Sequence, residues 1–163
     1  MHRAGHKKVL FPMMASMRFP YADLLARLEQ SGGEHATEAS SLSPSVERLL
    51  AGAGESRAKA MASLILLLKA RKATLQAAFD TTQVADELRL YQKFAKPGKP
   101  SAHIVQLRQS QAAARQATNV ARQSLIKAAS AFVRDAGIEV APRTPLDEFI
   151  TRWIEANLPK DEA

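Results

Sequence analysis

Three evenly spaced arginines are the residues of this chain best suited to bind a ligand. Arg108, Arg115 and Arg122 recur every seven residues, and a glutamine follows each of them. Seven residues turn an ideal helix to within about 20° of two full turns, so the three side chains stay on one side. A guanidinium group keeps its charge at physiological pH and donates paired hydrogen bonds, which suits phosphate oxygens. The spacing therefore predicts a line of phosphate-binding side chains along a helix.

The segment around these arginines lacks acidic residues altogether. No Asp or Glu occurs between Glu87 and Asp135, although the chain has 16 acidic residues among 163. Surface helices usually interleave both signs of charge, because neighbouring pairs stabilise the helix. A surface of one sign attracts a polyanion, most often nucleic acid. We therefore expect backbone contacts from the nine basic residues of this segment: Arg89, Lys93, Lys96, Lys99, Arg108, Arg115, Arg122, Lys127 and Arg134.

The same segment has a simpler interpretation, which the sequence leaves open. Arg and Gln are good helix formers and commonly occupy the solvated side of a coiled-coil-like helix. A second line at heptad spacing, called the seam below, predicts close helix packing; it consists of Leu107, Ala114, Thr118, Ala121, Leu125, Ala128 and Phe132. In this alternative the chain is a helical structural or adaptor protein that oligomerises through the Ala-rich seam, for instance in a phage, plasmid or secretion assembly.

Composition and periodicity favour helices. The chain is rich in Ala, Leu and Gln, only 6% of its residues are aromatic, and no segment alternates with the two-residue period of a strand. We expect an all-α helical bundle of five or six helices, with one long helix in the C-terminal half. Residues 1–18 are expected to form a flexible basic tail, 19–158 a single helical domain with a linker at about 31–43, and 159–163 a C-terminal tail.

Capping residues, glycines and prolines give the expected helix boundaries. Asp80, Ser101 and Thr144 are expected to cap the fourth, fifth and sixth helices, and Lys96–Pro100 forms a clear break. Val84, Leu88 and Tyr91 should lie on the inner face of the fourth helix. The expected helices span 21–30, a brief segment ending at residue 50, 55–79, 81–94, 102–136 and 145–158.

Basic groups also surround the break before the long helix. Lys93, Lys96, Lys99 and His103 would oppose the dipole of that helix, which favours anions at its N-terminus. A phosphate bound near Ser101 would relieve this conflict. The alternative is a solvated loop in which lysines maintain solubility.

The last expected helix carries a strong apolar stripe, formed by Leu146, Phe149, Ile150, Trp153, Ile154 and Leu158. We expect it to dock on the chain's own bundle rather than on a partner, because an open stripe of this kind favours aggregation. Trp153 is interpreted as a packing anchor rather than as a base-stacking platform.

The sequence offers no recognisable catalytic or metal-binding motif. Cysteine is absent, which excludes disulfides and thiol catalysis. A phosphate-binding loop of the Gly-rich type is missing, as is a histidine pair at metal-ligand spacing. The paired acids Asp147 and Glu148 have a local explanation, since they fall in the first turn of the last helix. We therefore expect no enzyme, no cofactor and no metal.

These observations favour a non-enzymatic nucleic-acid-binding accessory protein, a small subunit of a larger nucleoprotein complex such as an RNA-guided effector. Size and charge alone support this analogy. The expected partners are nucleic acid and protein subunits, self-association stays open, and DNA and RNA are not distinguished. No apolar run reaches the ~18 residues of a membrane span. Pro12 interrupts a short apolar stretch that would otherwise resemble a signal peptide, so we expect a cytoplasmic protein without a membrane partner.

Overall fold

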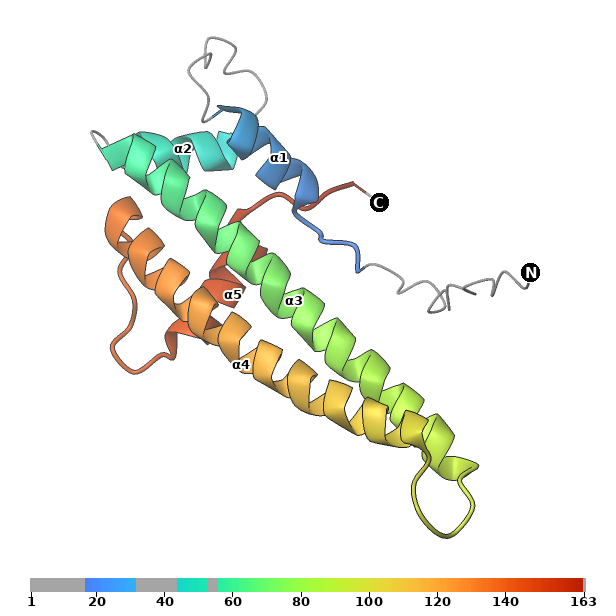
Figure 1. The fold of residues 1–163 in the computed structure, drawn as a ribbon. Helices are drawn as coiled ribbons and strands as arrows, with labels where there is room; N and C mark the ends of the chain where they lie inside the picture. Colours follow the sequence, from blue (N-terminus) through green and yellow to red (C-terminus); the bar gives the residue numbers. More distant parts are fainter. Residues whose placement is uncertain (1–16, 32–43, 53–55, 163) are drawn as a thin grey trace, which may run out of the picture.

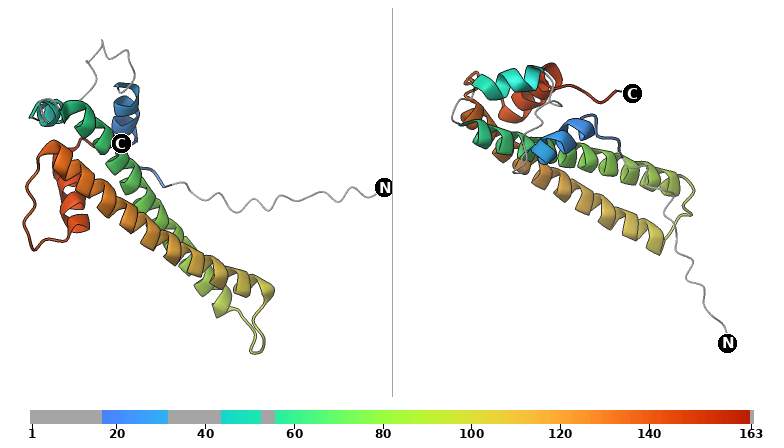
Figure 2. Two further views of the ribbon diagram at one scale, coloured as in Figure 1. Left: turned by 60° about the vertical axis from the view of Figure 1, so that its left-hand side comes forward. Right: turned by 90° about the horizontal axis from the view of Figure 1, so that it is seen from above.

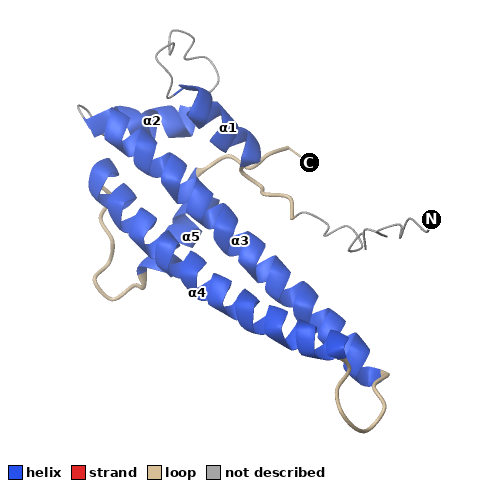
Figure 3. Cartoon of the chain, in the orientation of Figure 1, coloured by secondary structure: helices blue, strands red, loops and turns tan. Residues whose placement is uncertain are grey.

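The computed structural model describes residues 17–31, 44–52 and 56–162. This part of the chain is helical and contains no strand, which confirms the all-α prediction (Figure 3). Residues 1–16 of the expected tail and 32–43 of the expected linker lie outside the described residues. The helices are α1 (Ala22–Ser31), α2 (Pro44–Gly52), α3 (Arg57–Lys93), α4 (Ala102–Ala136) and α5 (Leu146–Asn157).

Two long antiparallel helices, α3 and α4, form the frame of the molecule (Figure 1). They contain 37 and 35 residues, which correspond to about 55 and 52 Å at ~1.5 Å per residue. The short helices α1, α2 and α5 gather around one end of this pair, which we call the core end. The opposite end projects beyond them as a bare two-helix arm, as the views from other sides also show (Figure 2). We define the arm as residues 77–121.

The hydrophobic core lies entirely at the core end. All five helices contribute buried side chains to it, including Leu28 of α1, Leu50 of α2, Leu64 of α3, Phe132 of α4 and Ile154 of α5. The arm has only a small separate cluster, formed by Leu88, Ile104 and Leu107. Burial of apolar area is the main stabilising term in folding. The core end therefore holds the fold together, and the arm depends on pairing of two helices.

α3 is one continuous helix, where the sequence predicted two. Asp80 does not cap a new helix but lies in the middle of α3, where its carboxylate accepts a hydrogen bond from Gln76 at 2.8 Å. The hydroxyls of Thr81 and Thr82 donate to the carbonyls of Ala77 and Ala78, one turn earlier. Asp and Thr commonly begin helices, but here their side chains form their hydrogen bonds within α3. No Gly or Pro interrupts residues 57–93, so the helix continues.

The limits of α4 agree with the prediction. Ser101 Oγ accepts a hydrogen bond from the Ile104 amide at 3.2 Å, and Gly137 ends the helix with a left-handed φ of 69°. α5 begins one residue later than predicted, at Leu146. Pro145 occupies the cap position, so Thr144 is not the cap. The Pro145 carbonyl accepts from the Phe149 amide at 3.0 Å and starts the helical hydrogen bonds.

α5 docks on the chain's own core, as predicted. Ile150 and Ile154 are fully buried, and the Trp153 ring meets the Phe132 ring edge to face with 5.0 Å between centroids. The segment that follows α5 returns to the beginning of α1. There the Asp161 carboxylate accepts from the Asp23 amide at 3.1 Å. This contact satisfies one of the free amides at the N-terminus of α1.

Candidate nucleic-acid interface

Arg108, Arg115 and Arg122 lie along one side of α4 with exposed side chains. Neighbours in this line are about 10.5 Å apart along the axis, at ~1.5 Å per residue. Arg122 lies at the end of this line that is next to α5. Its Nε is 2.9 Å from a carboxylate oxygen of Asp147 in the first turn of α5. The line therefore runs from α5 outward along the arm, and Arg115 and Arg108 lie beyond the cover of the short helices.

Arg108 and Arg115 have no side-chain partner among the residues that the structure describes. The reason is the missing acids: α4 has none before Asp135. Two of the three acids that α3 contributes to the arm already have partners, because Asp80 accepts from Gln76 and Asp86 pairs with Arg89. The two guanidinium groups therefore keep their full capacity to donate hydrogen bonds to an external ligand.

Arg89 joins these two arginines from the other helix of the arm. Antiparallel pairing of α3 and α4 is fixed by the Thr81–Thr118 hydroxyl contact at 3.2 Å and by the Tyr91 and His103 rings, whose centroids are 4.3 Å apart. This register brings Arg89 to about the level of Arg108. Arg89 is exposed and forms an i,i+3 ion pair with Asp86 at 3.4 Å. Such an accessible pair is weak, about 0–1 kcal/mol, so Arg89 can still exchange it for a phosphate.

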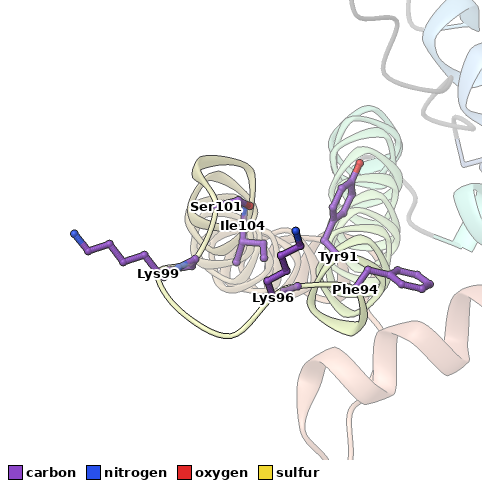
Figure 4. A pocket seen from close by; sticks show the side chains of 8 residues that line it. Tyr91, Phe94, Lys96, Lys99, Ser101 and Ile104 are labelled. Carbon is purple, nitrogen blue, oxygen red and sulfur yellow. The ribbon is translucent and has the colours of Figure 1, made fainter.

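Lys93, Lys96 and Lys99 gather at the tip of the arm, where the chain turns from α3 into α4. All three are exposed. Lys96 and Lys99 line a solvent-open pocket of about 360 Å³ together with Tyr91, Phe94, Ala95, Pro100, Ser101 and Ile104 (Figure 4). The Lys93 ammonium lies 5.8 Å from the centre of the Phe94 ring. The arm as a whole has six basic and three acidic residues, which leaves a net charge of +3.

Lys127 and Arg134 complete the predicted set, but the structure does not bring them to the arm. Both lie on the part of α4 that packs in the core end, and both are exposed. Arg134 Nε is 3.5 Å from the carboxylate of its neighbour Asp135. Five residues separate Lys127 from Arg122, and an ideal helix turns by ~140° (modulo a full turn) over that distance. Lys127 therefore faces a different side from the arginine line.

Sequence reasoning missed two features of this region. Tyr91 was predicted on an inner face, and its ring does contact His103 of α4, yet the residue is still 47% exposed and Phe94 is 73% exposed. The cause is the architecture, because no third helix covers the arm at this level. Asp147 was interpreted through the helix dipole alone, and its ion pair with Arg122 depends on how the loop after α4 folds back. The only available signal was the acidic charge of that first turn.

Two groups at the core end, Asp135 and Tyr21, have shifted pKa values. A hydrogen bond from the Ser63 hydroxyl lowers the pKa of Asp135, with the positive charge of Arg134 adding to the effect. Burial raises the pKa of Tyr21. Within the described ranges no cluster of three or more His, Asp or Glu side chains could hold a metal ion. No described helix is long and apolar enough to cross a membrane.

Comparisons with protein-family models, with curated proteins and with solved structures find no match for this chain. The function is therefore inferred from the geometry and charge of the arm.

Proposed function

We propose that this chain is a non-enzymatic, cytoplasmic accessory protein that binds the phosphate backbone of nucleic acid along its arm. The single observation that carries the proposal is the state of Arg108 and Arg115. These two arginines are exposed and unpaired on a helix that has no acid before Asp135, on the part of the molecule that extends beyond the core. Two uncompensated charges contribute little to folding, whereas a polyanion would give each of them a partner.

The division between arm and core end suits a subunit of a larger assembly. The arm presents arginines along one side and lysines at its tip, so a nucleic-acid strand could follow it over several phosphates. The C-terminal segment of the chain lies at the core end and is acidic, since residues 137–163 contain six acids and three bases. That acidic segment would be available to protein subunits of a nucleoprotein complex, of which an RNA-guided effector is one example.

Salt-dependent affinity tests this proposal. Binding to nucleic acid of random sequence should weaken steeply as salt rises, because bound phosphates release their counterions. The variant with Arg108→Gln and Arg115→Gln should bind all sequences more weakly. For duplex DNA its slope of log affinity against log salt should be smaller by about 1.8, since each phosphate contributes ~0.9.

A matched control removes two charges elsewhere. Arg48 on α2 and Lys160 near the C-terminus are exposed and lie away from the arm, so Arg48→Gln with Lys160→Gln changes the net charge equally. This control should retain most of the affinity and the slope. If the wild-type protein does not bind nucleic acid even at low salt, the proposal is wrong.

Exposed apolar side chains on the arm favour one competing function, that of a self-associating structural or adaptor protein. The seam itself packs within the chain, since Leu107, Ala121 and Leu125 are buried against α3. An oligomer would need another surface, and Leu90, Val105 and Val120 are exposed. Sedimentation equilibrium distinguishes the two functions: a stable oligomer that persists at high salt and binds no nucleic acid would favour the adaptor.

A further inference from the structure

The tip of the arm exposes two aromatic side chains, Tyr91, which also contacts His103 of α4, and Phe94. Phe94 is 73% exposed and Tyr91 is 47% exposed, and the arm's only cluster of buried residues is formed by Leu88, Ile104 and Leu107. An exposed phenyl ring forgoes most of the stabilisation of about 1.5–3 kcal/mol that burial would give it. Its position at the very end of α3, next to the loop, therefore needs a reason outside the fold.

The surroundings of these rings are positively charged. Lys93 lies beside the Phe94 ring, and Lys96 and Lys99 border the pocket that Tyr91 and Phe94 help to line. Figure 4 shows Lys96 between the two helices, Phe94 pointing away from α4 and Lys99 pointing away on the other side. No acidic residue lies within residues 88–134 to offset these charges. An occupant of the tip must therefore combine negative charge with a flat apolar surface.

We propose that the tip is a binding site for single-stranded nucleic acid, at which an unpaired base stacks on the exposed Phe94 ring while Lys96 and Lys99 hold the flanking phosphates. This inference rests on the proposed function and narrows it to a single-stranded ligand. A duplex buries the faces of its bases in its own stack, so it offers the tip only phosphates. A single strand offers both phosphates and exposed base faces. Stacking of its bases on aromatic side chains is largely independent of sequence.

The charge of the tip also favours a nucleic-acid strand over a second copy of the chain as its occupant. Each arm carries a net charge of +3, so two tips brought together would repel each other at short range. A single strand has the opposite sign and needs no rearrangement of α3 or α4.

The test compares three ligands of equal length at one salt concentration: an oligothymidylate, a duplex of random sequence and an abasic oligonucleotide. The protein variants are wild type, Phe94→Leu and Phe94→Trp, with Leu90→Ala as a matched control for loss of an exposed apolar group. Phe94 is exposed, so these variants should fold, and circular dichroism verifies it. Phe94→Leu should lose about 5- to 150-fold in affinity for oligothymidylate, because stacking on one ring contributes ~1–3 kcal/mol per base.

The other measurements define what would overturn the inference. Phe94→Trp should restore tight binding to the oligothymidylate, while affinities for the duplex and the abasic strand should change little in any variant. If Phe94→Leu leaves oligothymidylate binding unchanged while wild type still binds by charge, stacking at the tip is wrong and the proposed function survives. If wild type binds none of the three ligands, both fail. Vesicles containing phosphatidylglycerol serve as an additional ligand. If Phe94→Leu weakens binding to these vesicles but not to the oligothymidylate, the inference is overturned in favour of a membrane surface.

Discussion

Arg122 on α4 and Asp147 in the first turn of α5 form an ion pair, with 2.9 Å between the guanidinium Nε and a carboxylate oxygen. The pair lies where the arginine line meets the core end. The chain thus neutralises one of its three evenly spaced arginines and leaves the outer two free. Ion pairs open to solvent contribute about 0–1 kcal/mol, so the contact matters more for the charge of this surface than for stability.

Removing this ion pair should extend the proposed nucleic-acid-binding surface. Asp147→Asn releases Arg122, so we predict tighter binding to duplex DNA and a salt slope larger by ~0.9, the contribution of one more phosphate. Fluorescence anisotropy over a series of salt concentrations measures both. Glu148→Gln is the control, because it changes the charge equally at the next residue, which is exposed and forms no such pair with Arg122. Equal increases in both variants would mean that only the total charge matters.

A second pair of side chains, Ser63 and Asp135, joins α3 to α4 at the core end. The Ser63 hydroxyl donates a hydrogen bond to the Asp135 carboxylate, and this bond is the main cause of the lowered pKa of Asp135. A carboxyl group whose pKa is lower in the folded state stabilises the fold above its unfolded pKa. That stabilisation disappears as the pH falls through the folded pKa.

Ser63→Ala should therefore destabilise the protein mainly near neutral pH. The difference in unfolding free energy between wild type and variant should shrink as the pH falls below 3.8, the ordinary pKa of Asp135. Urea unfolding at a series of pH values measures this difference. Ser130→Ala, at an exposed position on α4, should show no such dependence. A constant difference across the pH range would show that the effect of Ser63→Ala does not come from the Asp135 charge.

Local signals in the sequence defined α4 well and α3 less well. Ser101 and Gly137 act at the ends of α4 as their residue types predict, and the heptad seam identified its buried side at Leu107, Leu125 and Phe132. Asp80 and Thr81 resembled the start of a helix because such residues often cap one. Their side chains instead bond within α3, and packing against α4 continues on both sides of them. Tertiary contacts thus override a local preference.

The candidate site was visible in the sequence as charge but not as geometry. The missing acids singled out the segment that contains the arm, and the spacing of Arg108 and Arg115 placed them on one side of a helix. Exposure of Phe94 could not be foreseen, because it follows from how far α1, α2 and α5 cover the pair of long helices. The different orientation of Lys127, in contrast, follows from helix geometry, because residue 127 lies ~140° round the helix from Arg122.

The buried seam of α4 should contribute more to stability than the exposed positions of the same helix. Leu125 is buried in the main core, so Leu125→Ala should cost about 2–5 kcal/mol in unfolding free energy. Val120 is 56% exposed on the same helix, and Val120→Ala should change stability by less than ~0.5 kcal/mol. Chemical denaturation gives both values. A similar cost for both variants would show that Val120 is covered, for instance in an oligomer.

The arm should open more readily than the core end. Leu88, Ile104 and Leu107 form its only buried cluster among the described residues, and regions with few buried apolar contacts have low local stability. Amide hydrogen exchange should therefore be faster at residues 84–92 and 103–112 than at 60–70 and 121–132. Saturating oligonucleotide should slow exchange on the arm selectively. Uniform protection along α3 in the free protein would contradict this division.

The last helix should be essential for the fold rather than only for assembly. α5 places Ile150 and Ile154, both fully buried, against a core that includes Leu125 and Phe132. A chain ending at Pro142 would expose the apolar surface beneath α5, so we expect a lower melting temperature and a tendency to aggregate. Because truncation is drastic, Ile154→Ala provides a milder change with an expected cost of about 2–5 kcal/mol.

Exposed positions on the same helix give the control, and Arg152→Ala should leave the melting temperature nearly unchanged. Thermal unfolding followed by circular dichroism compares the three proteins with wild type. Docking of α5 on a partner instead of on its own core would give the opposite pattern, a truncated chain that stays folded and keeps its nucleic-acid affinity. The 5.0 Å contact between the Trp153 and Phe132 rings provides an independent readout. Fluorescence of Trp153, the only tryptophan, should shift to longer wavelength in Ile154→Ala as the ring becomes more exposed to water.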